Sequence, residues 1–428
     1  LTEEAGMFAG LTTEEANKPI ALHLEKIGAL FALKKIEHQY PHCWRCHKPV
    51  IFRATSQWFC SVDDFKDDAV KAAEDVKWFP EWGKDRLQSM VKERADWCIS
   101  RQRKWGVPIP VVYCQDCGKE IIDNDIMMKV SKIFGEEGSD AWFAHDTEYF
   151  LPEGFKCPHC GSAKGFDKEK DIMDVWFDSG SSHAAVCARR KYLKVPADVY
   201  LEGADQYRGW FQSSLLTSVA GGHGAPYKQI ITHGWTVDGE GKKMSKSLGN
   251  GIAPQEIISK YGADILRLWV ASADYHADIR ISPEILKQIS DNYRKLRNTA
   301  RYCLSNLYDF DPDKDMVSNN ELEELDKYAL MKLDEVIKIA RDAFEVYDYH
   351  TAAHSLHNFC VVEMSNFYFD VLKDRLYTSA PQSKTRRAAQ TVLYKVLDAL
   401  TLVLTPILAF TADEIWQSMP HDTVSYTH

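Results

Sequence analysis

The sequence lacks several features that would define other classes of protein. It holds no run of roughly eighteen or more apolar residues, which excludes an ordinary membrane-spanning helix. It opens without a methionine, a basic segment or an apolar signal segment, so we expect it to begin inside a longer protein. It has neither an internal repeat nor a low-complexity stretch. Its net charge of −10 argues against a generally basic nucleic-acid coat, but allows a local basic track.

Cysteines are present in number, but their spacing does not fit an extracellular disulfide framework. Of eleven cysteines, six form three Cys-x-x-Cys pairs and five are scattered singly. In a large acidic chain without a secretory signal, this predicts a cytoplasmic protein with metal sites. Cys114–x–x–Cys117 and Cys157–x–x–Cys160 are each followed by glycine, which suits a tight zinc knuckle. They predict one closed, structural zinc site with four thiolates, the alternative being four buried cysteines without metal.

The third pair, Cys43 and Cys46, has no partner pair in this sequence. His42 and His47 lie beside it, but residues adjacent to a knuckle give poor tetrahedral geometry. We expect this half-site to be empty or irregular.

The pattern of apolar residues divides the sequence into an α/β part and a helical part. Apolar runs at 199–201 and 229–232 flank a helical stretch at 206–220. Strand, helix and strand in this order predict a right-handed parallel βαβ unit, half of a doubly wound sheet. Shorter runs at 50–52 and 111–113 also have strand character.

Beyond Pro254 the sequence predicts helices to its end. Pro254 suits the first turn of a helix, and Gly262 suits a helix stop. Apolar residues recur at spacings of three, four and seven from 325 to 347 and from 353 to 371. Residues 411–414 have the pattern of a capping box. Several helices with one apolar face each predict a helical bundle.

The segment 241–250, Gly-Lys-Lys-Met-Ser-Lys-Ser-Leu-Gly-Asn, carries the sharpest motif. Lysines at 243 and 246 alternate with serines between glycines, a composition that suits a loop binding phosphates. Composition alone also fits a basic surface loop. The full string resembles the KMSKS signature of class I aminoacyl-tRNA synthetases, and 232–234 and 237–238 agree with that family.

A second motif, Tyr-Leu-Glu-Gly-Ala-Asp-Gln-Tyr-Arg-Gly-Trp-Phe, spans 200–211. A strand that ends at Glu202 before a glycine turn places polar groups where open α/β sheets bind ligands. The alternative is a capped helix with Asp205 as N-cap. This string resembles isoleucyl-tRNA synthetases, and so do 53–59, 96–106, 174–180 and 261–269. The resemblance runs from about residue 40 to the C-terminus.

The resemblance implies specific roles for residues of these motifs. Lys243 and Lys246 would be the catalytic cations, and Ser245 would also contact ATP. The further substrate contacts that it implies are Glu202 (isoleucyl-adenylate), Gly203 and Asp205 (ribose), Gln206 (ammonium group), and Trp176 and Trp210 (walls of the isoleucine pocket). Zinc would be the bound metal, and ATP with Mg²⁺ a substrate. Cysteines matching Cys43 and Cys46 would lie upstream of this sequence.

A basic stripe in the helical part is a candidate RNA contact. Arg294, Arg297 and Arg301 follow one side of an expected helix from 285 to 304. Such a stripe is as compatible with an ordinary solvated face as with a ligand. In a synthetase, helices after the KMSKS loop contact tRNA, which favours phosphate binding.

The resemblance also implies an α/β plus all-α fold: the second half of a Rossmann-like parallel sheet with a zinc-knuckle insertion, then a helical anticodon-binding bundle. The expected domains are the end of an editing insertion (1–40), a return segment (41–110), the zinc-binding insertion (111–170), the catalytic half with the KMSKS loop (171–247), a stem-contact region (248–282) and an incomplete anticodon-binding domain (283–428).

The implied function is isoleucine–tRNA ligation, with isoleucine, ATP and tRNA-Ile as substrates. The sequence holds no string like the HIGH motif, which the family carries on the first half of its sheet. We therefore expect this chain to be inactive alone and to need an N-terminal half as partner. The alternatives are a piece of a split synthetase and a non-catalytic tRNA-binding or structural protein.

Overall fold

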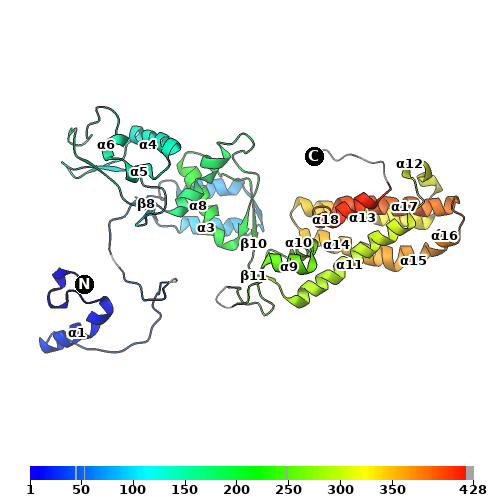
Figure 1. The fold of residues 1–428 in the computed structure, drawn as a ribbon, viewed down its shortest axis with the longest axis horizontal. Helices are drawn as coiled ribbons and strands as arrows, with labels where there is room; N and C mark the ends of the chain where they lie inside the picture. The colour runs from blue at the N-terminus through cyan, green and yellow to red at the C-terminus, as the bar shows by residue number, and fades with distance from the viewer. Residues whose placement is uncertain (44–45, 53, 246–248, 421–428) are drawn as a thin grey trace. The chain divides into compact units, whose positions relative to one another are not determined.

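The computed structural model describes residues 1–43, 46–52, 54–245 and 249–420 (Figure 1). The chain divides into two compact units, Leu1–Ser56 and Gln57–His428. The first holds the 3₁₀ helix η1 (Glu3–Phe8) and the helix α1 (Thr13–Lys26). A capping box starts α1, because the Thr12 hydroxyl accepts from the Glu15 amide and the Glu15 carboxylate accepts from the Thr12 amide. Residues 50–52 form no strand, and Phe52 is 83% exposed, so that prediction is wrong: no neighbouring strand covers the run.

A three-stranded parallel sheet is the centre of the α/β part of the second unit. Its strands are β2 (Lys77–Phe79), β10 (Gln229–His233) and β9 (Tyr200–Gly203), in that order. The helix α8 (Trp210–Ala220) joins β9 to β10, so the predicted βαβ unit is confirmed. Helices α2 (Lys66–Ala72) and α3 (Gly83–Lys92) and the turn η2 (Ala73–Asp75) pack with α8 around a core that contains Trp78, Phe211, Leu215 and Ile230.

The insertion has its own small core. The strands β5 (Val112–Cys114), β6 (Glu120–Ile121) and β7 (Phe166–Lys168) form an antiparallel sheet with β5 in the middle. The predicted strand at 111–113 thus corresponds to β5. Helices α4 (Asn124–Glu137), α5 (Ala141–Ala144) and α6 (Thr147–Phe150) cover this sheet, and Trp142 and Phe150 are fully buried.

Short elements connect the sheet, the insertion and the helical part. Two antiparallel pairs join β1 (Phe59–Cys60) to β3 (Trp97–Cys98) and β4 (Ser100–Arg101) to β8 (Ile172–Met173). They are followed by α7 (Val175–Gly180), the π-helix η3 (His183–Cys187) and the 3₁₀ turn η4 (Ala204–Tyr207). A parallel pair, β11 (Thr236–Val237) and β12 (Ile279–Arg280), lies after β10.

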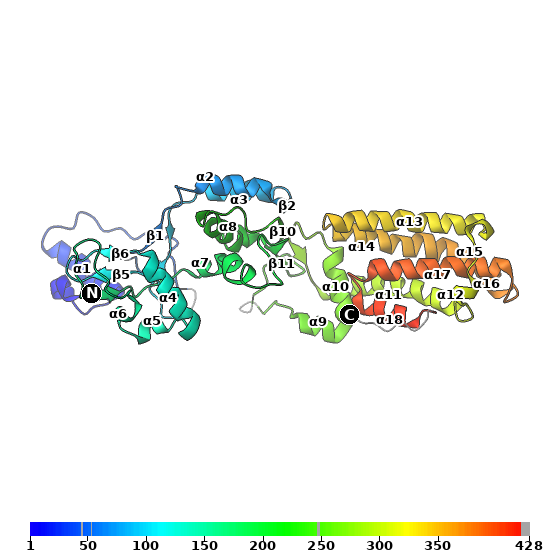
Figure 2. The same ribbon diagram turned by 90° about the horizontal axis from the view of Figure 1, so that it is seen from above.

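The helical part is a bundle around one large apolar core (Figures 1 and 2). Its elements are α9 (Pro254–Tyr261), α10 (Ala263–Ser272), α11 (Pro283–Asn306), α12 (Pro312–Asp315), η5 (Asn319–Glu321), α13 (Glu324–Glu345), α14 (Tyr349–Asn358), the π-helix η6 (Phe359–Tyr368), α15 (Phe369–Val371), α16 (Lys373–Tyr377), α17 (Lys384–Leu404) and α18 (Ala409–Ser418). Pro254 opens α9 and Gly262 ends it at φ +91°, as predicted. Within the described residues, no helix is long and apolar enough to cross a membrane.

The predicted capping box at 411–414 is wrong. α18 begins at Ala409, and no side chain of its own N-cap residue caps it. Instead, Asp264 of α10 accepts hydrogen bonds from the Thr411 amide at 2.7 Å and the Thr411 hydroxyl at 2.5 Å. A carboxylate from another helix therefore takes the position that a local cap would occupy.

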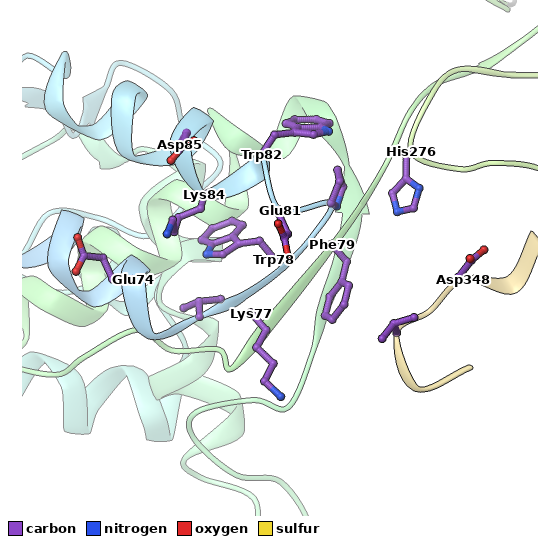
Figure 3. A pocket seen from close by; sticks show the side chains of 13 residues that line it. Glu74, Lys77, Trp78, Phe79, Glu81, Trp82, Lys84, Asp85, His276 and Asp348 are labelled. Carbon is purple, nitrogen blue, oxygen red and sulfur yellow. The ribbon is translucent and has the colours of Figure 1, made fainter. Parts of the chain in front are cut away.

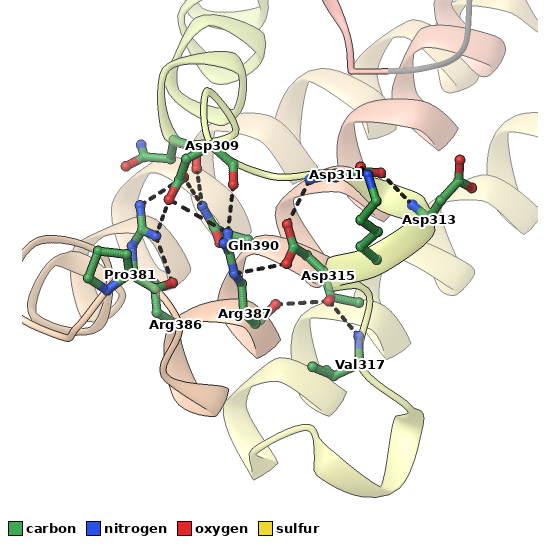
Figure 4. Close-up of polar contacts among 12 residues, drawn as sticks. Asp309, Asp311, Asp313, Asp315, Val317, Pro381, Arg386, Arg387 and Gln390 are labelled. Atoms are coloured by element: carbon green, nitrogen blue, oxygen red, sulfur yellow. Dashed lines mark hydrogen bonds and ion pairs between the residues drawn. The ribbon is translucent and has the colours of Figure 1, made fainter.

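Largely buried ion pairs and hydrogen bonds join the segment after α11 to α17 (Figure 4). Asp309, just after α11, accepts from both terminal nitrogens of Arg386 at 2.6 and 2.9 Å and from Gln390 at 2.8 Å. The Arg387 guanidinium donates to the Asp309 carbonyl at 2.9 Å. The segment after α11 is thereby attached to α17.

Candidate functional site

The turn between β9 and α8 presents a group of polar side chains at the carboxyl end of the parallel sheet. In the register of the sheet, Glu202 lies opposite Thr232 and Gly203 opposite His233. The Glu202 side chain is exposed and has no hydrogen bond or ion pair among the described residues. A Cβ atom at Gly203 would lie 2.8 Å from Asp205 Oδ1 and 3.4 Å from His233 Cε1. The glycine therefore keeps this turn open beside an exposed carboxylate.

Gln206 joins this turn to the start of α8. Its side-chain nitrogen donates to Asp205 Oδ2 at 3.1 Å, and its side-chain oxygen accepts from the Trp210 amide at 2.8 Å. The interpretation of Asp205 as N-cap is wrong, because Asp205 lies inside η4 and Gln206 takes the capping role. The Asp205 carboxylate remains exposed at the edge of the site.

The two tryptophans lie differently with respect to this turn. Trp176, in α7, is 41% exposed, and a Cβ at Gly209 would lie 3.0 Å from its ring and 2.4 Å from the Gln206 side-chain oxygen. Trp210 stacks on Tyr200 with ring centres 3.9 Å apart and donates its indole N–H to the Ser179 carbonyl at 3.0 Å. Trp176 thus borders the polar turn directly, and Trp210 is held in position by α7 and β9.

Asp174 is a supporting residue whose role the sequence did not indicate. It is buried. Its carboxylate accepts a hydrogen bond from the Trp97 indole at 2.9 Å and forms an ion pair with Arg101 at 3.1 Å. It also accepts from the Trp176 amide at 3.3 Å, which caps α7. An aspartate directly before a short helix was the available signal, but its tertiary partners lie about seventy residues upstream in the sequence.

The KMSKS segment is described in part. Lys246 lies outside the described residues, so its predicted contact with ATP has no structural counterpart here. Lys243 is described, and its ammonium lies 5.3 Å from the centre of the Trp235 ring. The Ser245 amide donates to Asn250 Oδ1 at 3.0 Å. Lys243 and Ser245 follow β11, which comes directly after the strand β10 that borders Glu202.

The four predicted zinc ligands converge. The sulfur atoms of Cys114, Cys117, Cys157 and Cys160 all lie within 4.8 Å of one another. The Gly118 amide donates to the Cys114 carbonyl, and the Gly161 amide donates to the Cys157 carbonyl, both at 2.8 Å. Both glycines have positive φ, as a knuckle turn requires. His159, which lies between Cys157 and Cys160 in the sequence, forms a hydrogen bond with the Glu120 carbonyl at 3.1 Å. Four thiols at such spacing fit a tetrahedral zinc ion.

In the first unit, which holds the pair Cys43 and Cys46, the backbone hydrogen bonds of Cys43 match those of Cys114 and Cys157. The His47 amide donates to the Cys43 carbonyl at 2.8 Å, and the Cys43 amide donates to the Lys48 carbonyl at 2.8 Å. His47 has a φ of +58°, where the other two knuckles have glycine. Among the described residues, no third and fourth ligand joins this pair. The expectation that this half-site is empty or irregular remains a prediction.

The three arginines of α11 have different partners. Arg294 pairs with Asp291 at 2.9 Å on the surface. Arg297 is bound through both terminal nitrogens to Glu414 of α18, at 2.7 and 2.5 Å. Arg301 is exposed and has no ion pair among the described residues. Arg297 therefore helps to hold two helices together, and phosphate binding by this stripe stays a prediction.

A cavity of about 940 Å³ lies along β2 and the turn that follows it, and no residue of the Glu202 turn lines it (Figure 3). Lys77, Trp82 and Asp85 line one side of it, and His276 and Asp348 line the other. Its charges are mixed in sign, and none of the predicted substrate contacts lines it. The geometry gives no single ligand chemistry to this cavity.

Comparison with known sequences agrees with these features. Residues 11–282 match the family described as tRNA synthetases class I (I, L, M and V), and residues 326–427 match the anticodon-binding domain of tRNA ligase. The chain is 60% identical over 419 residues to an isoleucine–tRNA ligase of Caldicellulosiruptor bescii and 59% identical over 421 residues to one of Caldanaerobacter subterraneus. Each match covers 98% of this chain and 45% of the relative. The chain thus spans less than half the length of these relatives.

Solved structures show the same fold at low sequence identity. Methionyl-tRNA synthetase of Mycobacterium tuberculosis, solved with methionyl-adenylate, superposes with a TM-score of 0.63 at 19% identity, covering 88% of this chain and 65% of that one. The leucyl enzyme of Agrobacterium radiobacter, solved with tRNA, gives 0.56 at 21% identity, covering 77% and 41%. Parallel sheet, four-cysteine insertion and helical bundle agree with the sequence matches: the chain belongs to the class I tRNA synthetases of the isoleucine, leucine, methionine and valine group.

Proposed function

We propose that this chain supplies part of the active site and the anticodon-binding region of an isoleucine–tRNA ligase. The observation that carries the proposal is the turn after β9, where Glu202, Asp205 and Gln206 gather beside Trp176 at the carboxyl end of the sheet. Rigid aromatic walls suit an aliphatic side chain, and polar groups at the turn suit an ammonium group and ribose hydroxyls. The identity of about 60% to isoleucine–tRNA ligases supports isoleucine as the amino acid.

The reaction needs no covalent enzyme intermediate. The isoleucine carboxylate attacks the α-phosphate of ATP in line and pyrophosphate leaves, which gives isoleucyl-adenylate. The acyl group then passes to a hydroxyl group of tRNA-Ile, and AMP leaves. Catalysis then consists of positioning and of neutralising charge on the leaving group. Lys243 and Lys246 would supply positive charge from this chain, with Ser245 as a further phosphate contact. Gly203 and Asp205 would bind ribose, and Gln206 the ammonium group.

Two further parts of the chain would serve this activity. The four cysteines suit a structural Zn²⁺ that holds the insertion together, because no coordination position is left open for a substrate. The helical bundle would bind tRNA, with Arg294 and Arg301 as exposed candidates for phosphate contacts. We place the activity in the cytoplasm, where translation uses its product.

The sequence contains no HIGH-like string, so we propose that activity requires a partner carrying that motif. The test combines this chain with an N-terminal segment of an isoleucine–tRNA ligase and measures isoleucine-dependent ATP–pyrophosphate exchange. We expect exchange from the mixture and none from the chain alone. Exchange by the chain alone at the rate of intact enzymes would contradict the need for a partner. Binding of tRNA-Ile without exchange in any mixture would favour a non-catalytic role.

A further inference from the structure

A polar turn follows β11 and is organised by Asp238. Its Oδ1 accepts from the Glu240 amide at 3.0 Å and the Lys242 amide at 2.8 Å, and its own amide donates to the Lys242 carbonyl at 2.9 Å. Gly241 allows the turn to close, because its φ of +85° favours glycine. A hydrogen bond from the Asn250 side chain, together with these backbone bonds, lowers the pKa of the Asp238 carboxyl. The carboxylate is therefore occupied by hydrogen bonds within this segment.

Asn250 connects this turn to the other end of the same segment. Its side-chain nitrogen donates to Asp238 Oδ2 at 2.9 Å and to the Lys243 carbonyl at 3.3 Å. Its side-chain oxygen accepts from the Ser245 amide at 3.0 Å. One amide group thus binds three points of the chain, and each contact uses a different hydrogen-bonding direction of the asparagine. An aspartate or leucine at 250 could not make this set of bonds.

The consequence falls on Lys243. Its backbone is paired with Val237 by an antiparallel bridge and is bound to Asn250 through its carbonyl. Its ammonium lies over Trp235, whose amide donates to Asp278 at 2.8 Å and whose carbonyl accepts from the Ile279 amide at 2.8 Å. The base of the side chain is fixed to β11, and the charged end lies on an exposed surface. Lysine loses much conformational freedom when it binds a ligand, so a fixed base lowers that cost.

We propose that Asp238 and Asn250 are positioning residues that fix the backbone of Lys243, so that its ammonium is available to the phosphate groups of ATP and pyrophosphate. This inference rests on the proposed function and deepens it, because it names the residues that organise the phosphate contact. Neither residue touches the phosphates; both act through Lys243.

The first test measures pyrophosphate binding by calorimetry and amide exchange over 236–245 by mass spectrometry, with the whole chain. Asn250→Ala removes three hydrogen bonds without changing net charge, and we expect about tenfold weaker binding and about tenfold faster exchange. Gln255→Ala is the matched control, because it also shortens an amide side chain without changing net charge, at an exposed position outside the turn. It should behave as the unaltered chain does. Unchanged binding and exchange in Asn250→Ala would overturn the inference.

A second test separates positioning from general stability. If Asn250 acts through Lys243, Asn250→Ala should weaken pyrophosphate binding little once Lys243→Ala is present, so the two effects should not add. Full additivity would overturn the inference. The exchanged pair Asp238→Asn with Asn250→Asp keeps net charge and restores a donor facing an acceptor, so it should bind more tightly than Asn250→Asp alone. If the unaltered chain binds no pyrophosphate while Asn250→Ala still speeds exchange, the phosphate role in the proposed function fails, but the turn itself is as described.

Discussion

Carboxylates at the turn after β9 and in the core of the helical bundle are satisfied in opposite ways. At the turn after β9, the carboxylates of Glu202 and Asp205 are exposed, and Glu202 has no partner among the described residues. In the bundle, Asp326 is fully buried and accepts from Arg375 at 2.9 and 2.8 Å and from Tyr368 at 2.6 Å. The same kind of group is exposed to solvent in one place and enclosed by hydrogen-bonding partners in the other.

If the proposed function is correct, this difference separates residues that bind substrate from residues that stabilise the fold. A buried charge is tolerated only when it is paired, so removing its partner destabilises the fold. An exposed carboxylate contributes little to the fold, so removing it should change the free energy of unfolding by about 0.5 kcal/mol or less. The four thiols of the insertion are an intermediate case. They lie close together, as paired buried groups do, but a metal ion from solution would have to complete the site. Stability measurements on matched variants can test each part of this comparison.

Removal of the metal should give the largest effect and should be confined to the insertion. Structural zinc contributes about 10–16 kcal/mol in small zinc-finger peptides at neutral pH. We expect one zinc per chain, near-complete loss of it in Cys157→Ser, and local unfolding around β5 and β7. Metal analysis and amide exchange measure this, with Cys187→Ser as control. Full zinc in Cys157→Ser would contradict the site, and equal exchange in the bundle and the insertion would contradict its confinement.

Loss of a buried partner in the bundle should come next. Arg375→Ala leaves the Asp326 carboxylate buried without its cation, which should lower the free energy of unfolding by about 3–5 kcal/mol. Lys373→Ala, in the same helix, removes an exposed pair with Asp370 and should cost about 0.5 kcal/mol or less. Urea unfolding of the two variants gives the comparison. Similar costs for both would mean that burial does not set the value of these pairs.

A smaller, pH-dependent effect is expected at Asp309. Arg386, with Gln390, holds the pKa of Asp309 below its ordinary value. A depressed folded pKa adds stability above the unfolded pKa of about 3.9, and this stability is lost as the pH falls through the folded pKa. Asp309→Asn should therefore cost about 1.5–3 kcal/mol near neutral pH, and the difference should shrink below about pH 4. Unfolding curves from pH 3 to 7 measure it. A difference independent of pH would exclude the ionised carboxylate as its source.

Local patterns in the sequence predicted the elements whose partners are near in the chain. The βαβ unit and the Cys-x-x-Cys knuckles were predictable because residues less than forty apart determine each of them. The four-cysteine cluster followed from two such knuckles with one metal geometry. The strand β2 was not predicted, since three residues with alternate burial give too short a pattern to distinguish from a loop.

Local sequence patterns could not predict some of the contacts that decide the role of a residue. Asp264 caps α18 from 147 residues away, so the capping pattern at 411–414 was misleading. The alternative role of Asp205 as N-cap came from the preference for aspartate at that position, but the longer Gln206 reaches the Trp210 amide. Arg297 belongs to the predicted basic stripe, but its guanidinium is paired with Glu414. For Thr411 and Arg297 a distant neighbour decides the role of the residue, whereas at Asp205 the role goes to the next residue in the sequence.

The smallest effect on stability, combined with a large effect on activity, is expected at the turn after β9. Glu202→Gln and Asp205→Asn alter exposed groups, so each should change the free energy of unfolding by about 0.5 kcal/mol or less. In the mixture with a HIGH-bearing segment, loss of a charged hydrogen-bond partner worth about 1.5–3 kcal/mol should slow isoleucine-dependent exchange by about tenfold to a hundredfold. Glu256→Gln, an exposed change in α9, is the control for both measurements. A substantial loss of stability would mean that these carboxylates support the fold in the same way as Asp326. Unchanged stability with unchanged exchange would remove the turn from the active site and leave the parallel sheet without the ligand edge that its topology suggests.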